Sequence, residues 1–177
     1  MVVSSVTPRM SPISARSRAR SVSVRAASSV EVVAEPPLAA QVRIDLLLDE
    51  RSFHPTRTHS GDGVICGSGR VDGRPVYVWA QNVKHKGGSL GQAGGATIIR
   101  TIEAASKAGA PVVGFLHSGG ARLQEGIGAL GAYASIFRAT SRATVPQISV
   151  ICGPCAGGAA YSPSLGTLVM MVGEEAQ

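Results

Sequence analysis

Two motifs that could carry chemistry follow each other near the end of the chain. Cys152-Gly153-Pro154-Cys155 has the spacing of a thioredoxin-type redox pair, in which a thiolate attacks a disulfide. The next residues, AGGAA at 156–160, are typical of a glycine turn that begins a helix. Only 22 residues follow Cys155, too few to complete a thioredoxin fold, so redox chemistry is the less favoured interpretation. A four-cysteine zinc site would need a second pair, and Cys66 stands alone.

A second glycine turn has the same context as the first. The stretch HSGGARLQEG at 117–126 follows one predicted buried strand, and CGPCAGGAAYS at 152–162 follows the next. Each turn is expected to place consecutive backbone N–H groups at a helix start, where such donors are unpaired. Two converging N–H groups form an oxyanion hole, and glycine leaves room for the carbonyl that they polarise. One turn alone would indicate tight packing, whereas two on successive strands favour a binding site.

A third glycine-rich stretch fits the pattern of a nucleophile elbow. GGSLG at 87–91 matches G-x-S-x-G, and His117 and Glu103 are available to complete a triad with Ser89. However, Lys84-His85-Lys86 separates Ser89 from the preceding strand, whereas an elbow needs a direct turn from strand to serine. A hydrolase that uses Ser89 therefore stays open as a rival hypothesis.

The stretch GIGALG at 126–131 fits the dinucleotide-binding pattern G-x-G-x-x-G. That site requires a strand directly before it and an acidic residue about 20 positions later. No Asp or Glu occurs between Glu125 and Glu174, so we assign these glycines to helix packing.

The elements that must position these motifs alternate between strands and helices. A hairpin is predicted at Asp72-Gly73, and Gly109 is expected to end a helix. We expect helices over 41–53, 91–109, 126–143 and 157–166, and strands over 63–71, 74–82, 111–117, 145–152 and 167–172. This order predicts an α/β fold with parallel strands and both sheet faces covered. Ligands of such sheets sit beyond the carboxyl ends of the strands, where the glycine clusters lie.

The charge is distributed unevenly along the chain. Residues 1–30 hold five Arg and no acidic residue, whereas the remaining 147 residues hold 12 basic and 11 acidic side chains. The folded part is therefore nearly neutral, and the absence of a basic stripe argues against a nucleic-acid partner. No apolar run reaches the roughly 20 residues needed to span a membrane. We expect no membrane partner either.

The N-terminal residues 1–40 are rich in Ser, Arg and Ala, and we expect them to form a disordered extension. Arginine and serine without acids are also typical of an organelle transit peptide. Three cysteines without a secretory signal indicate reduced thiols inside the cell. We therefore expect a cytoplasmic protein, with the mitochondrial matrix as the alternative.

Two long stretches resemble a known family. GGSLGQAGGATIIRTIEAASKAGAPVVGFLHSGGARLQEG and VPQISVICGPCAGGAAYSPSL resemble the carboxyltransferase (beta) subunits of biotin-dependent acyl-CoA carboxylases, of the propionyl-CoA carboxylase type. The resemblance covers about residues 41–173. It implies a crotonase-like superhelix of ββα units that binds acyl-CoA. Residues 41–177 would be part of the N-terminal carboxyltransferase domain, and the chain would end before that domain is complete.

The resemblance also implies roles for the glycines. Gly157 and Gly158 match the glycines that cradle the acyl-CoA carbonyl, and Gly119 and Gly120 match the other donor turn. The residues expected to line the substrate site are Gly87, Gly88, Ser89, Ala121, Ala156 and Ala159. The resemblance implies that no side-chain base is needed here, because decarboxylated biotin would take the α-proton. On this interpretation Cys152 and Cys155 are structural.

The implied activity is transfer of a carboxyl group from carboxybiotin to the α-carbon of a short acyl-CoA. Biotin would arrive on a carrier protein, and no metal is expected in this chain. The implied partners are a biotin carboxylase or biotin carboxyl carrier subunit, and a second carboxyltransferase half or further copies of the chain. The isolated chain is expected to be inactive without them. A biotin-dependent decarboxylase and a non-catalytic remnant or assembly subunit are the alternatives.

Overall fold

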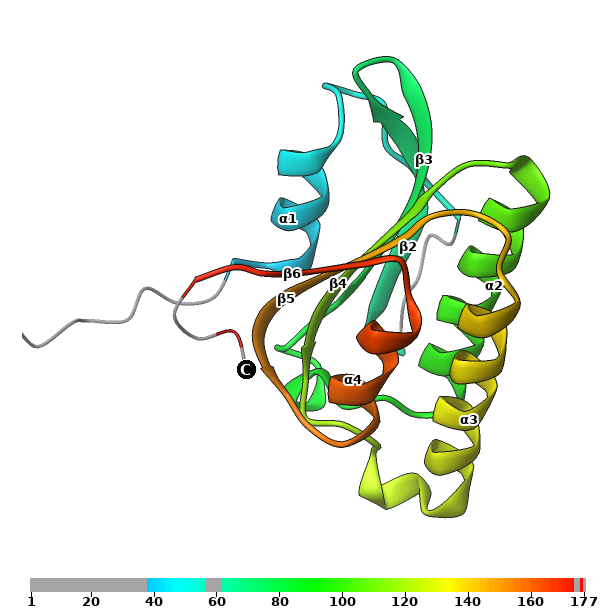
Figure 1. Cartoon of the computed structure of the whole chain (residues 1–177). Helices are drawn as coiled ribbons and strands as arrows, with labels where there is room; N and C mark the ends of the chain where they lie inside the picture. Colours follow the sequence, from blue (N-terminus) through cyan, green and yellow to red (C-terminus); the bar gives the residue numbers. More distant parts are fainter. Residues whose placement is uncertain (1–37, 57–61, 174–175, 177) are drawn as a thin grey trace, which may run out of the picture. The chain divides into compact units, whose positions relative to one another are not determined.

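The computed structural model of the chain describes residues 38–56, 62–173 and 176 (Figure 1). Its strands form one six-stranded sheet in the order β1-β2-β3-β4-β5-β6. The strands are β1 (His54–Pro55), β2 (Val64–Val71), β3 (Arg74–Gln81), β4 (Val112–Ser118), β5 (Gln147–Cys155) and β6 (Leu168–Met171). The helices are α1 (Ala40–Leu47), α2 (Gln92–Ala108), α3 (Ile127–Arg142) and α4 (Gly158–Tyr161), with short 3-10 turns η1 (Lys86–Gly88), η2 (Leu123–Glu125) and η3 (Ser162–Leu165).

The predicted hairpin joins β2 to β3, which pair antiparallel. Asp72 and Gly73 both have positive φ angles, 49° and 74°, as a two-residue turn of the primed type requires. The carboxylate of Asp49 accepts hydrogen bonds from both turn N–H groups, at 2.9 Å from Asp72 and 2.8 Å from Gly73. The hairpin prediction is therefore confirmed, and the turn is anchored by a residue from another segment.

The first helix is shorter than predicted. The expected helix over 41–53 is observed as α1 over Ala40–Leu47, and Leu48 already has an extended backbone. The chain turns away at this point because Asp49 binds the β2–β3 turn and its own N–H donates to the carbonyl of Arg70. Of the predicted N-terminal extension 1–40, residues 1–37 lie outside the described residues.

From β3 onward the strands are parallel, as predicted: β3 pairs with β4, β4 with β5 and β5 with β6. The helix α2 ends at Gly109, which adopts the left-handed conformation with φ 66°. Because β3, β4 and β5 run in the same direction, their carboxyl ends meet at one edge of the sheet. The three glycine-rich loops therefore emerge side by side.

Two separate hydrophobic clusters cover the two faces of the sheet. One lies under α2 and α3 and includes Trp79, Ile98 and Ile136. The other lies under α1 and includes Ile44 and Phe115. Figure 1 shows α1 on one side of the sheet and α2 with α3 on the other.

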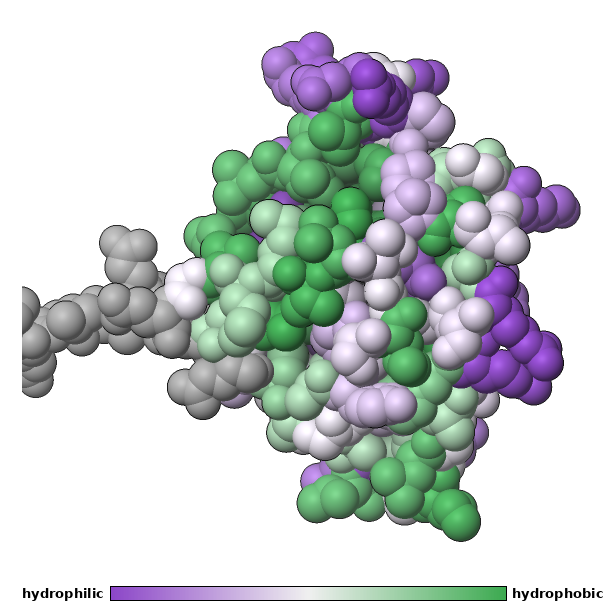
Figure 2. Space-filling model, viewed as in Figure 1, coloured by the Kyte–Doolittle hydropathy of each residue, from purple (hydrophilic) through white to green (hydrophobic). Residues whose placement is uncertain are grey.

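The prediction that both faces of the sheet are covered is wrong for the last strand. Among the described residues, no helix follows β6, and its side chains are exposed. Figure 2 shows hydrophobic residues gathered over α1 and β6. The exposed large apolar residues of this region are Leu38, Val42, Leu46, Leu168, Val169, Met170, Met171 and Val172.

The segment around the two cysteines is more extended than predicted. The strand expected over 145–152 continues to Cys155, so the Cys-Gly-Pro-Cys motif lies within β5. The helix expected over 157–166 is divided into α4 and the 3-10 turn η3. Pro163 lies in the first turn of η3, and its missing N–H prevents a continuous α-helix.

Candidate functional site

Backbone hydrogen bonds join the three glycine-rich loops at the carboxyl edge of the sheet. The N–H of Gly119 donates to the carbonyl of Gly87 at 3.0 Å, and the N–H of Leu90 donates to Gly120 at 2.8 Å. The N–H of Ala156 donates to the carbonyl of Ser118 at 3.0 Å. The structure thus brings together the loops that contain the predicted site residues, although these loops lie far apart in the sequence.

Close contacts explain why two of these positions are glycine. A Cβ on Gly88 would collide with the carbonyl oxygen of His117, and a Cβ on Gly120 would lie 2.8 Å from the carbonyl oxygen of Ala156. Both residues also have positive φ angles, 68° and 85°. Any side chain here would push the loops apart.

In the second turn, different constraints require glycine at positions 157 and 158. Gly157 has φ 55° and ψ −122°, and the space where its Cβ would point is open. A Cβ on Gly158 would instead lie 2.5 Å from the ring of Tyr133. Gly157 therefore provides the backbone conformation of the turn and borders an open surface. Gly158 allows the turn to pack directly on an aromatic ring.

The two turns differ in which of their N–H groups are free. Gly119 donates to Gly87, and Gly120 donates to the Oγ of Ser118 at 3.1 Å. Within the part of the chain that the structure describes, the N–H groups of Gly157 and Gly158 donate to no backbone or side-chain acceptor. Of these four predicted donors, the two that are free to bind an oxygen atom are therefore Gly157 and Gly158.

The remaining predicted site residues lie at different depths. Gly87 is exposed at the same edge, Ala121 is half-buried and forms a bridge with Leu90, and Ala156 is exposed. Ala159 is buried, and it belongs to the hydrophobic cluster under α2 and α3. It thus anchors the residues directly after the second turn in the hydrophobic core.

The hydroxyl of Ser89 makes a local bond. Its Oγ donates to the carbonyl of Lys86 at 2.7 Å, which commits its proton within the 3-10 turn. Glu103, the acid considered for a triad, lies in the middle of α2 and faces a groove between α2 and α3. The geometry therefore does not favour the nucleophile-elbow hypothesis.

An ion pair beside the site was not found by sequence reasoning. Arg122 is buried, and its guanidinium binds Glu125 at 2.9 Å and the carbonyl of Ser89 at 2.7 Å. Glu125 also accepts the N–H of Gln92 at 2.7 Å, at the first residue of α2. The Gln92 N–H and the Arg122 guanidinium hold the pKa of Glu125 below its usual value. The carboxylate therefore stays ionised and ties the loop after β4 to the start of α2.

Two glycines outside these turns, Gly128 and Gly114, lie against other side chains. In the GIGALG stretch, Gly128 faces the side chain of Gln92, where a Cβ would collide. This contact supports a packing role for Gly128, whereas a Cβ on Gly126 or Gly131 would meet nothing within 4 Å. In β4, Gly114 leaves room for the indole ring of Trp79.

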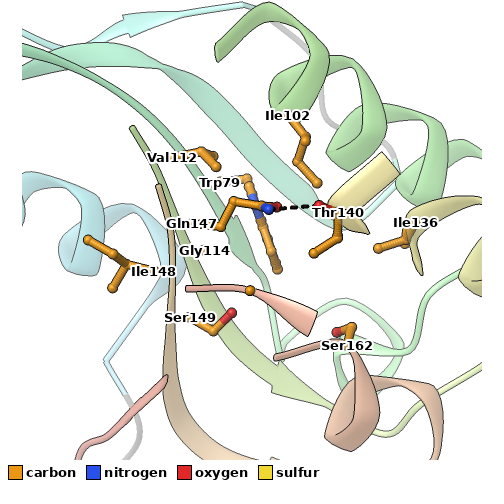
Figure 3. Close-up of a pocket in the computed structure, with 11 residues that line it drawn as sticks. Trp79, Ile102, Val112, Gly114, Ile136, Thr140, Gln147, Ile148, Ser149 and Ser162 are labelled. Atoms are coloured by element: carbon orange, nitrogen blue, oxygen red, sulfur yellow. Dashed lines mark hydrogen bonds between the residues drawn. The ribbon is translucent and has the colours of Figure 1, made fainter. Parts of the chain in front are cut away.

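A small cavity lies near the amino ends of β4 and β5, away from the glycine turns (Figure 3). Its volume is ≈ 20 Å³, and Trp79, Ile136 and Gln147 are among its lining residues. The side-chain amide of Gln147 donates to the carbonyl of Thr140 at 2.8 Å across its wall (Figure 3). A void of this size has room for about one water molecule, so it is a feature of the core.

Among the described residues, no group of three or more His, Cys, Asp or Glu side chains is placed to bind a metal ion. No helix in the described ranges is both long enough and apolar enough to cross a bilayer.

Comparisons with known proteins agree with the architecture. Residues 34–177 match the family model described as the carboxyl transferase domain. The propionyl-CoA carboxylase beta chain of Saccharopolyspora erythraea is 47% identical over 150 residues, which cover 75% of this chain and 28% of that protein. The human mitochondrial propionyl-CoA carboxylase beta chain is 43% identical over 154 residues, covering 76% and 29%.

Solved structures of related enzymes also resemble this chain. Transcarboxylase 12S, with methylmalonyl-coenzyme A and methylmalonic acid bound, matches with a TM-score of 0.72 and 39% identity, over 76% of this chain and 30% of that chain. The Pseudomonas malonate decarboxylase hetero-dimer matches with a TM-score of 0.68 and 34% identity, over 76% and 61%. These similarities confirm the predicted crotonase-like α/β fold.

The chain spans 28% and 29% of the length of the two curated relatives described above. The family model, in contrast, matches most of the chain, including every described strand and helix. The glycine turns that the structure brings together lie within that match. The chain therefore belongs to the carboxyl transferase domain family.

Proposed function

We propose that this chain is part of a carboxyltransferase that moves a carboxyl group from carboxybiotin to the α-carbon of a short acyl-CoA. The observation that carries the proposal is the free pair of N–H groups at Gly157 and Gly158, on a turn that borders an open surface. Membership of the carboxyl transferase family supports it, as do relatives named propionyl-CoA carboxylase beta chain. The bound methylmalonyl-coenzyme A of transcarboxylase 12S supports the class of substrate.

The two N–H groups would act on the thioester oxygen. When the α-carbon of an acyl-CoA loses its proton, negative charge develops on this oxygen. Donors that are already in position stabilise that charge without reorganisation, and one such donor is typically worth about 10²–10³ in rate. The charge would therefore be stabilised by backbone atoms, without a carboxylate or metal from this chain.

Carboxybiotin, on a carrier protein, would supply the carboxyl group. We assign none of the described residues to biotin, since the thioester oxygen accounts for the free N–H groups of Gly157 and Gly158. The proposed partners are a biotin carboxylase or carrier subunit and a polypeptide with the rest of the carboxyltransferase, or further copies of this chain. The proposed compartment is the cytoplasm, with the mitochondrial matrix as the alternative, and the relative named as a mitochondrial beta chain supports the alternative.

Reconstitution tests the proposal. The full chain is combined with the remaining part of a propionyl-CoA carboxylase beta chain, biotin carboxylase, carrier, ATP, propionyl-CoA and labelled bicarbonate. We expect acid-stable label in methylmalonyl-CoA only when the chain is present. Absence of label in an assembled complex would contradict the proposal. Release of CO2 from methylmalonyl-CoA without ATP, and no forward reaction, would assign decarboxylation instead.

A further inference from the structure

One buried hydroxyl group connects the loops around the proposed site. Ser118 is only 1% exposed and is the last residue of β4. Its Oγ donates to the carbonyl of Gly88 at 2.9 Å and accepts the N–H of Gly120 at 3.1 Å. Its own carbonyl accepts the N–H of Ala156 at 3.0 Å. A single residue therefore contacts the loop after β3, the loop after β4 and the loop after β5.

The hydrogen-bonding capacity of this hydroxyl is fully used. A serine hydroxyl has one proton and two lone pairs. The proton goes to Gly88 and one lone pair accepts Gly120, so the Tyr133 hydroxyl, 3.5 Å away, is the donor to the second lone pair. Without the Ser118 hydroxyl, the Gly88 carbonyl and the Gly120 N–H would be buried and unpaired, which is costly.

Tyr133 extends this connection to the donor turn. Its ring lies directly against Gly158, where a Cβ would approach within 2.5 Å. Burial raises the pKa of Tyr133, so its hydroxyl keeps the proton that it donates. Ser118 is thus linked to the second turn in two ways. Its carbonyl binds the N–H of Ala156 directly. Its hydroxyl contacts the Tyr133 hydroxyl, and the ring of Tyr133 packs against Gly158.

We propose that Ser118 is the positioning residue of the thioester site, and that the N–H groups of Gly119 and Gly120 hold this frame together instead of binding substrate. The inference rests on the proposed function. Both N–H groups of the first turn already have protein acceptors, and one of those acceptors is Ser118 itself. Loss of the hydroxyl would therefore move the donors of Gly157 and Gly158 without removing them.

Nuclear magnetic resonance of the full, ¹⁵N-labelled chain tests this. Propionyl-CoA is added at millimolar concentration, and the amide signals of Gly157 and Gly158 are followed. We expect them to shift in the wild-type chain. In Ser118→Ala the affinity should fall about tenfold, because displaced N–H groups would bind the thioester oxygen less well. The Gly120 amide should also exchange faster with solvent, because its acceptor is gone.

Thr101→Val is the matched control. Thr101 is buried, and its hydroxyl donates to the carbonyl of Thr97 at 2.9 Å, within α2 and away from the turns. This variant should lose comparable stability and bind propionyl-CoA like the wild type. If Ser118→Ala does not fold, Ser118→Cys keeps the volume with a weak donor, and the same loss of affinity is expected.

The outcomes separate the positioning role of Ser118 from the proposed function of the chain. If the Gly157 and Gly158 signals shift equally in wild type, Ser118→Ala and Thr101→Val, the positioning role is wrong and the proposed function stands. If those signals do not shift in the wild type even when the remaining part of the carboxyltransferase is supplied, the proposed site is wrong, and the role of Ser118 falls with it.

Discussion

Cys152 and Cys155 lie on opposite faces of the sheet. Cys152 packs against the hydrophobic cluster under α1, and Cys155 against the cluster under α2 and α3. Both belong to β5, and an odd spacing along an extended strand points side chains in opposite directions. Burial raises the pKa of both thiols, which disfavours the reactive thiolate. The geometry supports a structural role for the pair.

We therefore expect the double variant Cys152→Ser, Cys155→Ser to keep reconstituted carboxyl transfer within a few-fold of wild type. Each hydroxyl replaces a half-buried thiol, so the melting temperature should fall while the reaction remains. Labelled bicarbonate incorporation measures the activity, and circular dichroism checks the fold. Complete loss of activity with an intact fold would restore the redox hypothesis.

Gly157→Ala should reduce carboxyl transfer by about 10²-fold, the typical effect of displacing one oxyanion donor. The residue has φ 55°, which a side chain disfavours, so the backbone N–H would rotate away from the thioester. Gly119→Ala is the control, because its Cβ would lie 3.5 Å from its nearest neighbour, the Gly87 carbonyl oxygen. That variant should retain activity within about threefold, as for an ordinary surface change. If Gly119→Ala loses activity and Gly157→Ala keeps it, the donors belong to the first turn.

Gly158→Val should also abolish transfer, but the structure changes the reason expected from the sequence. The new side chain would collide with the ring of Tyr133 below the turn before it met a substrate above. We therefore expect a lower melting temperature in this variant together with the lost activity. An unchanged melting temperature would show that the ring can move aside.

Ser89→Ala should leave carboxyl transfer unchanged. The hydroxyl donates to the carbonyl of Lys86 within a local turn, so its removal alters no contact with the donor turn. The reconstituted assay measures the rate, and thioester hydrolysis is followed in parallel through release of free CoA. Loss of activity in this variant, with Gly157→Ala active, would favour the hydrolase hypothesis.

Glu125→Gln should change the pH dependence of stability. The pKa of Glu125 in the folded chain lies below its usual 4.5, so its charge stabilises the fold above that pH. This contribution is lost as the pH falls through the lowered pKa. The difference in melting temperature between wild type and variant should therefore be greatest at neutral pH and shrink in acid. A difference that stays constant over this range would show that the charge is not its source.

Local signals in the sequence were sufficient for most of the elements. Asp72-Gly73 predicts the hairpin and Gly109 the end of α2, because positive φ angles there leave little choice of residue. Buried apolar runs predict β4 and β5, and their order predicts parallel pairing. The family resemblance, carried by the glycine-rich stretches, was confirmed by the carboxyl transferase match.

Other features depend on contacts between distant segments, which no local pattern contains. The early end of α1 follows from Asp49 binding a turn more than 20 residues later. The split between occupied and free N–H groups follows from Ser118, Gly87 and Gly120 meeting at one edge. The sequence by itself determined which residues have glycine's conformational freedom. Only the tertiary structure decided which of their N–H groups remain unpaired, because hydrogen-bond partners are chosen by the packing of separate strands and loops.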